Sequence, residues 1–170
     1  MKLRLETICI FLMLCSAVAA DDSAQRLRLY ADVQARSQEV RIGVRKPFTA
    51  TLVAERDAEA PQVSTVAFKL DVPDGIVIVG EELLVQSLVA IGTPRGGMHL
   101  AFHCVEAAQV PVYRFKMVAM RPLDGVVLRT QPVVIEDQEG RYEFLGIAAC
   151  GDETYANWPC APAALTIHAR

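Results

Sequence analysis

Apolar and polar residues alternate along most of the chain, which is the pattern of strands that bury one face. The alternation is clear in residues 66–72 (VAFKLDV) and again in residues 98–104 (MHLAFHC). Turn residues separate such stretches, as at Pro73-Asp74-Gly75, where proline presets one backbone dihedral and glycine tolerates the next. The stretches that carry the pattern are 26–31, 39–44, 48–54, 66–72, 76–79, 98–104, 112–120, 126–130, 142–149 and 164–168.

About nine short strands joined by turns predict an all-β chain folded as an antiparallel β-sandwich. No repeat, low-complexity tract or linker interrupts the pattern, so we expect residues 21–170 to form a single domain. Residues 81–90 (EELLVQSLVA) leave two interpretations open. Leu84 and Leu88 share one side of a short helix, yet the segment is also short enough to be another strand.

Residues 1–20 differ from the rest, because Lys2 and Arg4 precede an apolar run that small residues close before Asp21. This is the pattern of a secretory signal peptide, with cleavage expected before Asp21. The apolar run is shorter than the roughly 20 residues that span a bilayer, and no later segment is long enough. We expect an exported chain, periplasmic, extracellular or at the cell surface, with no transmembrane segment. Lipid attachment at Cys15 is the alternative.

The inward face of residues 98–104 is expected to belong to the core. His99 and His103 then share the outward face, about 13 Å apart, which is too far for both to bind one metal ion. Glu136, Asp137 and Glu139 do not follow the ligand spacing of a calcium loop, and a solvated hairpin turn is expected there. The inward residues are expected to be Met98, Leu100, Phe102 and Cys104.

Residues 64–84 (STVAFKLDVPDGIVIVGEELL), a strand ending at Cys104 and a cysteine-bearing C-terminal strand together resemble secreted bacterial β-sandwich proteins of the cohesin-like, immunoglobulin-like type. The resemblance covers most of the mature chain as a pattern of strands and turns. It implies a nine-stranded, jelly-roll-like sandwich with a binding role. Cohesins proper hold a calcium-binding dockerin partner, and this chain carries no dockerin-like loop. No binding residue is transferred, because a shared fold does not carry function with it.

Charge and motifs exclude several classes of function. The chain has 17 Lys and Arg against 20 Asp and Glu, a net charge of −3, without the basic cluster that nucleic acid or an anionic membrane requires. It has no nucleophile-elbow, zinc-protease or phosphate-loop motif. We therefore expect no cofactor, no metal site and no catalytic residue, while a small exported hydrolase or thiol enzyme remains the alternative class.

Three cysteines follow the signal peptide: Cys104, Cys150 and Cys160. Cys150 and Cys160 enclose CGDETYANWPC, whose spacing is not that of a redox pair and which contains no histidine for zinc. In an oxidising compartment we expect these two to form a disulfide, worth about 2.8 kcal/mol in the chain-entropy model. Cys104 is then expected to be a buried free thiol. A bond from Cys104 to either of the others stays open, because sequence does not fix connectivity.

The function that these features favour is a secreted binding or interaction module for a protein or a carbohydrate. Within the cysteine-bounded loop, Tyr155 and Trp158 offer the rigid aromatic surface that anchors such partners. The alternative for Trp158 is that it folds back and closes the end of the sandwich. A structural envelope protein is the remaining alternative function.

Overall fold

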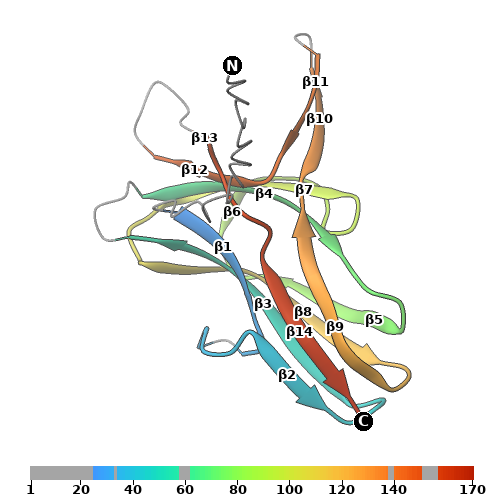
Figure 1. Cartoon of the computed structure of the whole chain (residues 1–170). Helices are drawn as coiled ribbons and strands as arrows, with labels where there is room; N and C mark the ends of the chain where they lie inside the picture. The colour runs from blue at the N-terminus through green and yellow to red at the C-terminus, as the bar shows by residue number, and fades with distance from the viewer. Residues whose placement is uncertain (1–24, 33, 58–61, 138–139, 151–156) are drawn as a thin grey trace, which may run out of the picture.

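The computed structural model describes residues 25–32, 34–57, 62–137, 140–150 and 157–170, in which every regular element is a β-strand. The strands form two packed layers with a projecting hairpin (Figure 1), which confirms the predicted all-β sandwich. They are β1 (Gln25–Tyr30), β2 (Glu39–Ile42), β3 (Pro47–Arg56), β4 (Val63–Asp71), β5 (Ile76–Leu83), β6 (Ser87–Thr93), β7 (Gly97–Val105), β8 (Gln109–Ala119), β9 (Leu123–Gln131), β10 (Val133–Asp137), β11 (Gly140–Phe144), β12 (Gly146–Ala149), β13 (Asn157–Pro159) and β14 (Ala164–Ala169).

One layer is a four-stranded sheet in the order β1-β3-β8-β5. The other is built around β4, which pairs with β12, β7 and β9. From there β12 pairs with β13, β7 with β6, and β9 with β14, which in turn pairs with β2. Every one of these pairings is antiparallel except that of β14 with β2. The hairpin of β10 and β11 projects from the sandwich (Figure 1).

The core between the layers has an aromatic centre. Phe68 of β4 meets Tyr113 of β8 edge to face, with ring centroids 6.2 Å apart, and Tyr113 stacks on Phe115 at 4.9 Å. All three side chains are buried. Aromatic pairs of this kind contribute about 0.5–1.5 kcal/mol beyond the burial of their surface. Because Phe68 belongs to one layer and the other two rings to the other, these contacts join the layers.

The turn predicted at Pro73-Asp74-Gly75 is present and carries the chain from β4 to β5. The Ile76 N–H donates to the Pro73 carbonyl at 3.2 Å, and Gly75 has a φ of +92°. This left-handed conformation favours glycine. A Cβ at this position would also lie 2.7 Å from Nε of Arg121.

Two expected segments differ in extent from the strands observed. Residues 81–90, for which a helix and a strand were both open, contain the end of β5 and the start of β6. The expected strand 142–149 is divided into β11 and β12, and β10 and β13 are additional short strands. The described part of the chain therefore has fourteen strands, more than the expected nine or so.

The outward position of Cys104 corrects one prediction. The other three inward residues predicted on β7 are buried, but Cys104 is exposed. In β4, Val63 and Thr65 are two positions apart, whereas their partners Val105 and Ala101 are four positions apart in β7. At this irregularity the alternation of faces fails, because the consecutive residues His103 and Cys104 are both exposed. Val105 therefore packs against the core in place of Cys104.

The disulfide joins Cys104 to Cys150, with their Cα atoms 5.8 Å apart. The predicted bond between Cys150 and Cys160 is thus wrong, and so is the prediction that Cys104 is a buried free thiol. Cys160 lies outside the bond and is buried. The bond links the ends of β7 and β12, two strands that both pair with β4. Closing a loop with a sequence separation of 46 stabilises the fold by about 4 kcal/mol in the chain-entropy model.

The pairing of β12 with β13 explains why Cys150 and Cys160, although close in sequence, do not form a disulfide. The Cys160 N–H donates to the carbonyl of Leu145 at one end of β12, while Cys150 follows Ala149 at the other end. The five residue-to-residue steps of extended chain from Leu145 to Cys150 cover about 17 Å. A disulfide requires Cα atoms within about 7 Å. The two cysteines are therefore separated by the length of the strand between them.

Phe102 and its exposed neighbour His103 test the register of β7. Phe102→Ala should lower the free energy of unfolding by about 3–5 kcal/mol, because it removes a ring that is only 3% exposed. His103→Ala should lower it by less than about 1 kcal/mol, because this side chain is exposed. Chemical denaturation of both variants measures the difference, and equal losses would show that the register is wrong.

The cysteine connectivity can be measured directly. Non-reducing peptide mapping should yield a disulfide-linked pair of peptides that contain Cys104 and Cys150. Cys104→Ser and Cys150→Ser should lower the melting temperature by similar amounts, and the double variant by little more, because all three lose the same bond. A linked peptide pair with Cys150 and Cys160 would contradict the structure.

Candidate functional site

The aromatic loop predicted to bind a partner lies mostly outside the described residues. Tyr155 falls within residues 151–156, and although Trp158 belongs to β13, its side chain also lies outside the description. The structure does show that β13 pairs with β12. The binding role of these two residues stays a prediction.

Exposed apolar side chains are concentrated on β5 and β6, the edge strands of the two layers. Of seven large apolar side chains that are exposed in the described part of the chain, five belong to these two strands. Their exposed fractions run from 46% to 61%. Such a concentration differs from the scattered apolar residues of an ordinary surface. This apolar strip consists of Val77, Val79, Leu88, Val89 and Ile91.

The strip lies on the edges of both layers. In the described part of the chain β5 pairs only with β8, and β6 pairs only with β7, so each has one unpaired edge. Six of the seven residues of β6 are exposed, and its sequence, SLVAIGT, contains no charge. An unpaired apolar edge without charge is a template for pairing with another strand unless something covers it.

Neighbouring residues on β7 keep this surface uncharged. Val89 and Ile91 of β6 lie opposite Ala101 and His99. Burial lowers the pKa of His99 below its ordinary value of 6.5, because removal from water disfavours the charged imidazolium. The His99 side chain is therefore neutral at pH 7, and the surface beside Val89 and Ile91 presents apolar and neutral groups.

A groove of about 320 Å³ opens at the end of the strip, where the link between β5 and β6 meets the start of β8. Its wall is largely apolar and includes Leu84, Phe102, Val105 and Val110. A groove of this kind can take one apolar side chain of a partner that lies along β6. The strip and the groove together form one candidate docking surface.

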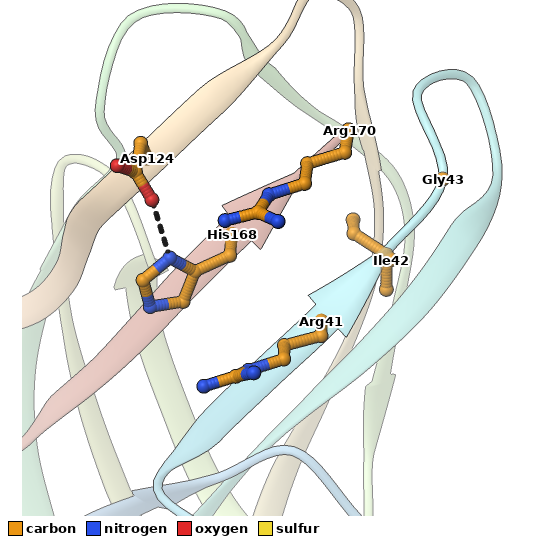
Figure 2. Close-up of a pocket in the computed structure, with 6 residues that line it drawn as sticks. All are labelled: Arg41, Ile42, Gly43, Asp124, His168 and Arg170. Carbon is orange, nitrogen blue, oxygen red and sulfur yellow. Dashed lines mark hydrogen bonds and ion pairs between the residues drawn. The ribbon is translucent and has the colours of Figure 1, made fainter.

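A second, charged pocket of about 380 Å³ lies beside β2, β9 and β14, near the Ala119 end of β8, whereas the groove lies at its Gln109 end. Figure 2 shows its side chains, with the dashed contact between His168 and Asp124. Strand β14 runs between β9 and β2, so residues far apart in the sequence meet there. The pocket is lined by Arg41, Ile42, Gly43, Asp124, His168 and Arg170.

Two carboxylates lie beside the imidazole of this pocket. His168 Nδ1 lies 2.7 Å from Asp124 Oδ1, and Nε2 lies 3.7 Å from Glu39 Oε1. The hydrogen bond from His168 lowers the pKa of Asp124, and the bond from Arg41 Nε, 2.8 Å long, lowers the pKa of Glu39. Both carboxylates are ionised at neutral pH and only accept hydrogen bonds. His168 Nδ1 must therefore be the donor to Asp124.

The chemistry of this pocket gives no support to the hydrolase alternative. A histidine oriented by a carboxylate can act as a base, but none of the six lining residues carries a hydroxyl or thiol nucleophile for it to activate. Cys104 is committed to the disulfide. Within the described ranges, no three His, Cys, Asp or Glu side chains are grouped to hold a metal ion, and no helix there is long and apolar enough to cross a membrane.

Comparison with known proteins identifies the architecture. No family model and no curated protein sequence matches the chain. Among solved structures, the cohesin module of a Clostridium perfringens ATCC13124 family 33 glycoside hydrolase superposes with a TM-score of 0.53 at 10% identity, covering 86% of this chain and 98% of that one. The third ScaB cohesin of R. flavefaciens, in complex with a group 1 dockerin, gives 0.54 at 8% identity, covering 87% and 97%.

A non-cellulosomal cohesin from Archaeoglobus fulgidus gives 0.51 at 10% identity, covering 85% and 91%. The chain has a cohesin-like β-sandwich fold. This confirms the family resemblance inferred from the strand and turn pattern. Identities near 10% show the fold alone, so the binding surface of the cohesin-like domain must be argued from its own residues.

Sequence patterns identified these surfaces only in part. The uncharged run of residues 87–93 in the cohesin-like domain is visible in the sequence. The sequence alone does not show that this run forms an edge strand, because a helix and a strand were both open for residues 81–90. The charged pocket gives no local signal at all. Its lining residues lie on or next to β2, β9 and β14, which are far apart in the sequence and are brought together by the β2–β14–β9 pairing.

The link between His168 and Asp124 can be tested by pH titration. His168→Gln should raise the pKa of Asp124 toward its ordinary value of 3.8, because the hydrogen bond to the ionised carboxylate is its largest cause of lowering. Glu39 is the internal control, since its lowered pKa depends first on Arg41 and should move little. NMR of the side-chain carboxyl carbons measures both values. An unchanged pKa of Asp124 would contradict the contact.

Proposed function

We propose that this chain is an exported protein-binding module that docks a partner polypeptide along the apolar strip. The observation that carries the proposal is the concentration of exposed aliphatic side chains on two unpaired sheet edges. Leaving such an edge bare exposes apolar surface to water and invites non-specific pairing. A cognate partner removes both costs.

The geometry of β6 favours strand addition as the mode of binding. An extended segment of the partner pairs with the open edge of β6 through main-chain hydrogen bonds, and its alternate side chains contact Val89 and Ile91. A side chain near its end enters the groove formed by Leu84, Phe102 and Val110. Main-chain pairing supplies affinity in this mode, and the groove supplies selectivity.

The chemistry of the strip favours a protein over a carbohydrate. Sugars are bound by aromatic rings with polar groups beside them, whereas the strip consists of aliphatic Val, Leu and Ile side chains. Tyr155 and Trp158 are proposed as an additional anchor on the same module. Cohesins of this fold have been solved in complex with dockerins, so the architecture serves protein binding elsewhere.

Export is part of the proposal. The first twenty residues have the pattern of a signal peptide. A disulfide that closes a long loop, as Cys104–Cys150 does, forms and persists in an oxidising compartment. The partner is accordingly expected in the periplasm, at the cell surface or in the medium.

A pair of substitutions on β6 tests the docking surface. The double variant Val89→Lys, Ile91→Lys adds charge to exposed positions, so it should block docking while leaving the melting temperature within a few degrees of wild type. Met120→Lys is the matched control, because Met120 is 50% exposed but lies outside the strip. The measurement is affinity capture from the envelope and medium of the source organism, followed by titration of the captured protein.

The expected result is a specific protein that wild type and the Met120→Lys control bind equally and that the double variant binds at least about tenfold more weakly. Capture that does not depend on Val89 and Ile91 would contradict docking on the strip. Glycan-array binding that survives the double variant would favour the carbohydrate alternative.

A further inference from the structure

We propose that the charged pocket of Figure 2 is a second binding site, which takes a small ligand through a single carboxylate group. The inference rests on the pocket alone and does not depend on the docking of a protein partner. At about 380 Å³, the pocket falls in the range of roughly 300–1,000 Å³ that small-molecule sites occupy. It lies near the opposite end of β8 from the groove, so a partner along β6 leaves it open.

Arginine side chains supply the recognition. In Figure 2 the side chains of Arg41 and Arg170 lie on either side of His168. Arg41 is already paired with Glu39 at 2.8 Å. By contrast, no carboxylate side chain in the described part of the chain lies within ion-pair distance of the Arg170 guanidinium. A planar guanidinium that is left in this way matches a carboxylate through two parallel hydrogen bonds.

The side-chain charges around the pocket disfavour a ligand with two negative charges. The positive charges of Arg41 and Arg170 equal the negative charges of Asp124 and Glu39, both of which have lowered pKa values and are ionised. A dianion such as phosphate would bring two charges close to two ionised carboxylates, which repel it. One carboxylate on Arg170 leaves the existing pairs of Arg41 and His168 intact.

Hydrogen bonds fix the backbone of Arg170 and the ring of His168 in the absence of a ligand. The Arg170 N–H donates to the Ile42 carbonyl, and the Val44 N–H donates to the Arg170 carbonyl, each at 3.1 Å. The hydrogen bond to Asp124 fixes the His168 ring. Ile42 and the bare backbone of Gly43 leave an apolar wall with room for the body of the ligand.

A pair of sugars that differ in one group tests the carboxylate. Glucuronate and glucose share a ring, but only glucuronate carries a carboxylate. In NMR titrations of the full mature chain, glucuronate should give saturable shifts at residues 41–43, 124 and 168–170, and glucose should give none. A tripeptide with a free C-terminus, compared with its C-terminal amide, shows whether a chain end can supply the same group. Equal responses to glucuronate and glucose would overturn the proposal.

Arginine variants locate the binding group. Arg170→Gln should weaken glucuronate binding by about tenfold or more, because it removes a charge-assisted pair of hydrogen bonds. Arg170→Lys, which keeps the charge but loses the planar fork, should fall between this variant and wild type. Arg95→Gln is the control, because Arg95 is exposed between β6 and β7, away from the pocket. Its affinity should equal that of wild type.

Three further results would overturn the proposal. The first is unchanged affinity in Arg170→Gln, and the second is tighter binding of inorganic phosphate than of glucuronate. The third is loss of glucuronate binding in the Val89→Lys, Ile91→Lys variant, because that would place the ligand on the strip. The Val89→Lys, Ile91→Lys variant also keeps the two proposals distinguishable. It should lose binding of the protein partner and retain binding of glucuronate.

Discussion

The contact of Phe68 with Tyr113 and Phe115 fixes how the two layers face each other. Aromatic rings fill the space between a strand of one layer and a strand of the other, so the inward positions along both sheets are committed to packing. What remains for binding is the perimeter, where strands end or lack a neighbour. Both candidate sites lie there: the apolar strip follows the open edges of β5 and β6, and the charged pocket lies near the end of the β2–β14–β9 pairing.

The two sites differ in the physical effect that each uses. Along the strip, apolar surface and unpaired main-chain groups are available together, which suits an extended polypeptide, and the neutral His99 adds no charge to be desolvated. In the pocket, Arg41 and Asp124 already have partners, and the backbone of Arg170, whose side chain is exposed, is hydrogen-bonded to residues 42 and 44. The first surface gains from excluding water over a long contact, whereas the second gains from orienting a few charges.

The local alternation of apolar and polar residues was enough to predict the class of fold. The inward residues of β4, Phe68 among them, occupy alternate positions and are buried between the layers. This alternation was not enough where pairing between distant strands decides the outcome. Cys104 departs from the alternation where the pairing opposite Val63 and Thr65 becomes irregular, and residues 98–104 alone contain no sign of this. Likewise, Cys150 and Cys160 are close in sequence but lie at opposite ends of β12, because the ladder with β13 spaces them. The charged pocket was missed for this reason too, since its three strands meet only through long-range pairing.

The Cys104–Cys150 bond has a mechanical consequence. When the chain is pulled from its two ends, tension that enters at Cys104 passes through the sulfur bridge to Cys150 and bypasses the chain between them. A sequence separation of 46 corresponds to about 160 Å of extended backbone. The chain that forms β8, β9, β10, β11 and β12 therefore cannot be pulled out into extended backbone while the bridge is intact. Reduction of this one bond would release that hidden length and let the pulled module lengthen by the same amount.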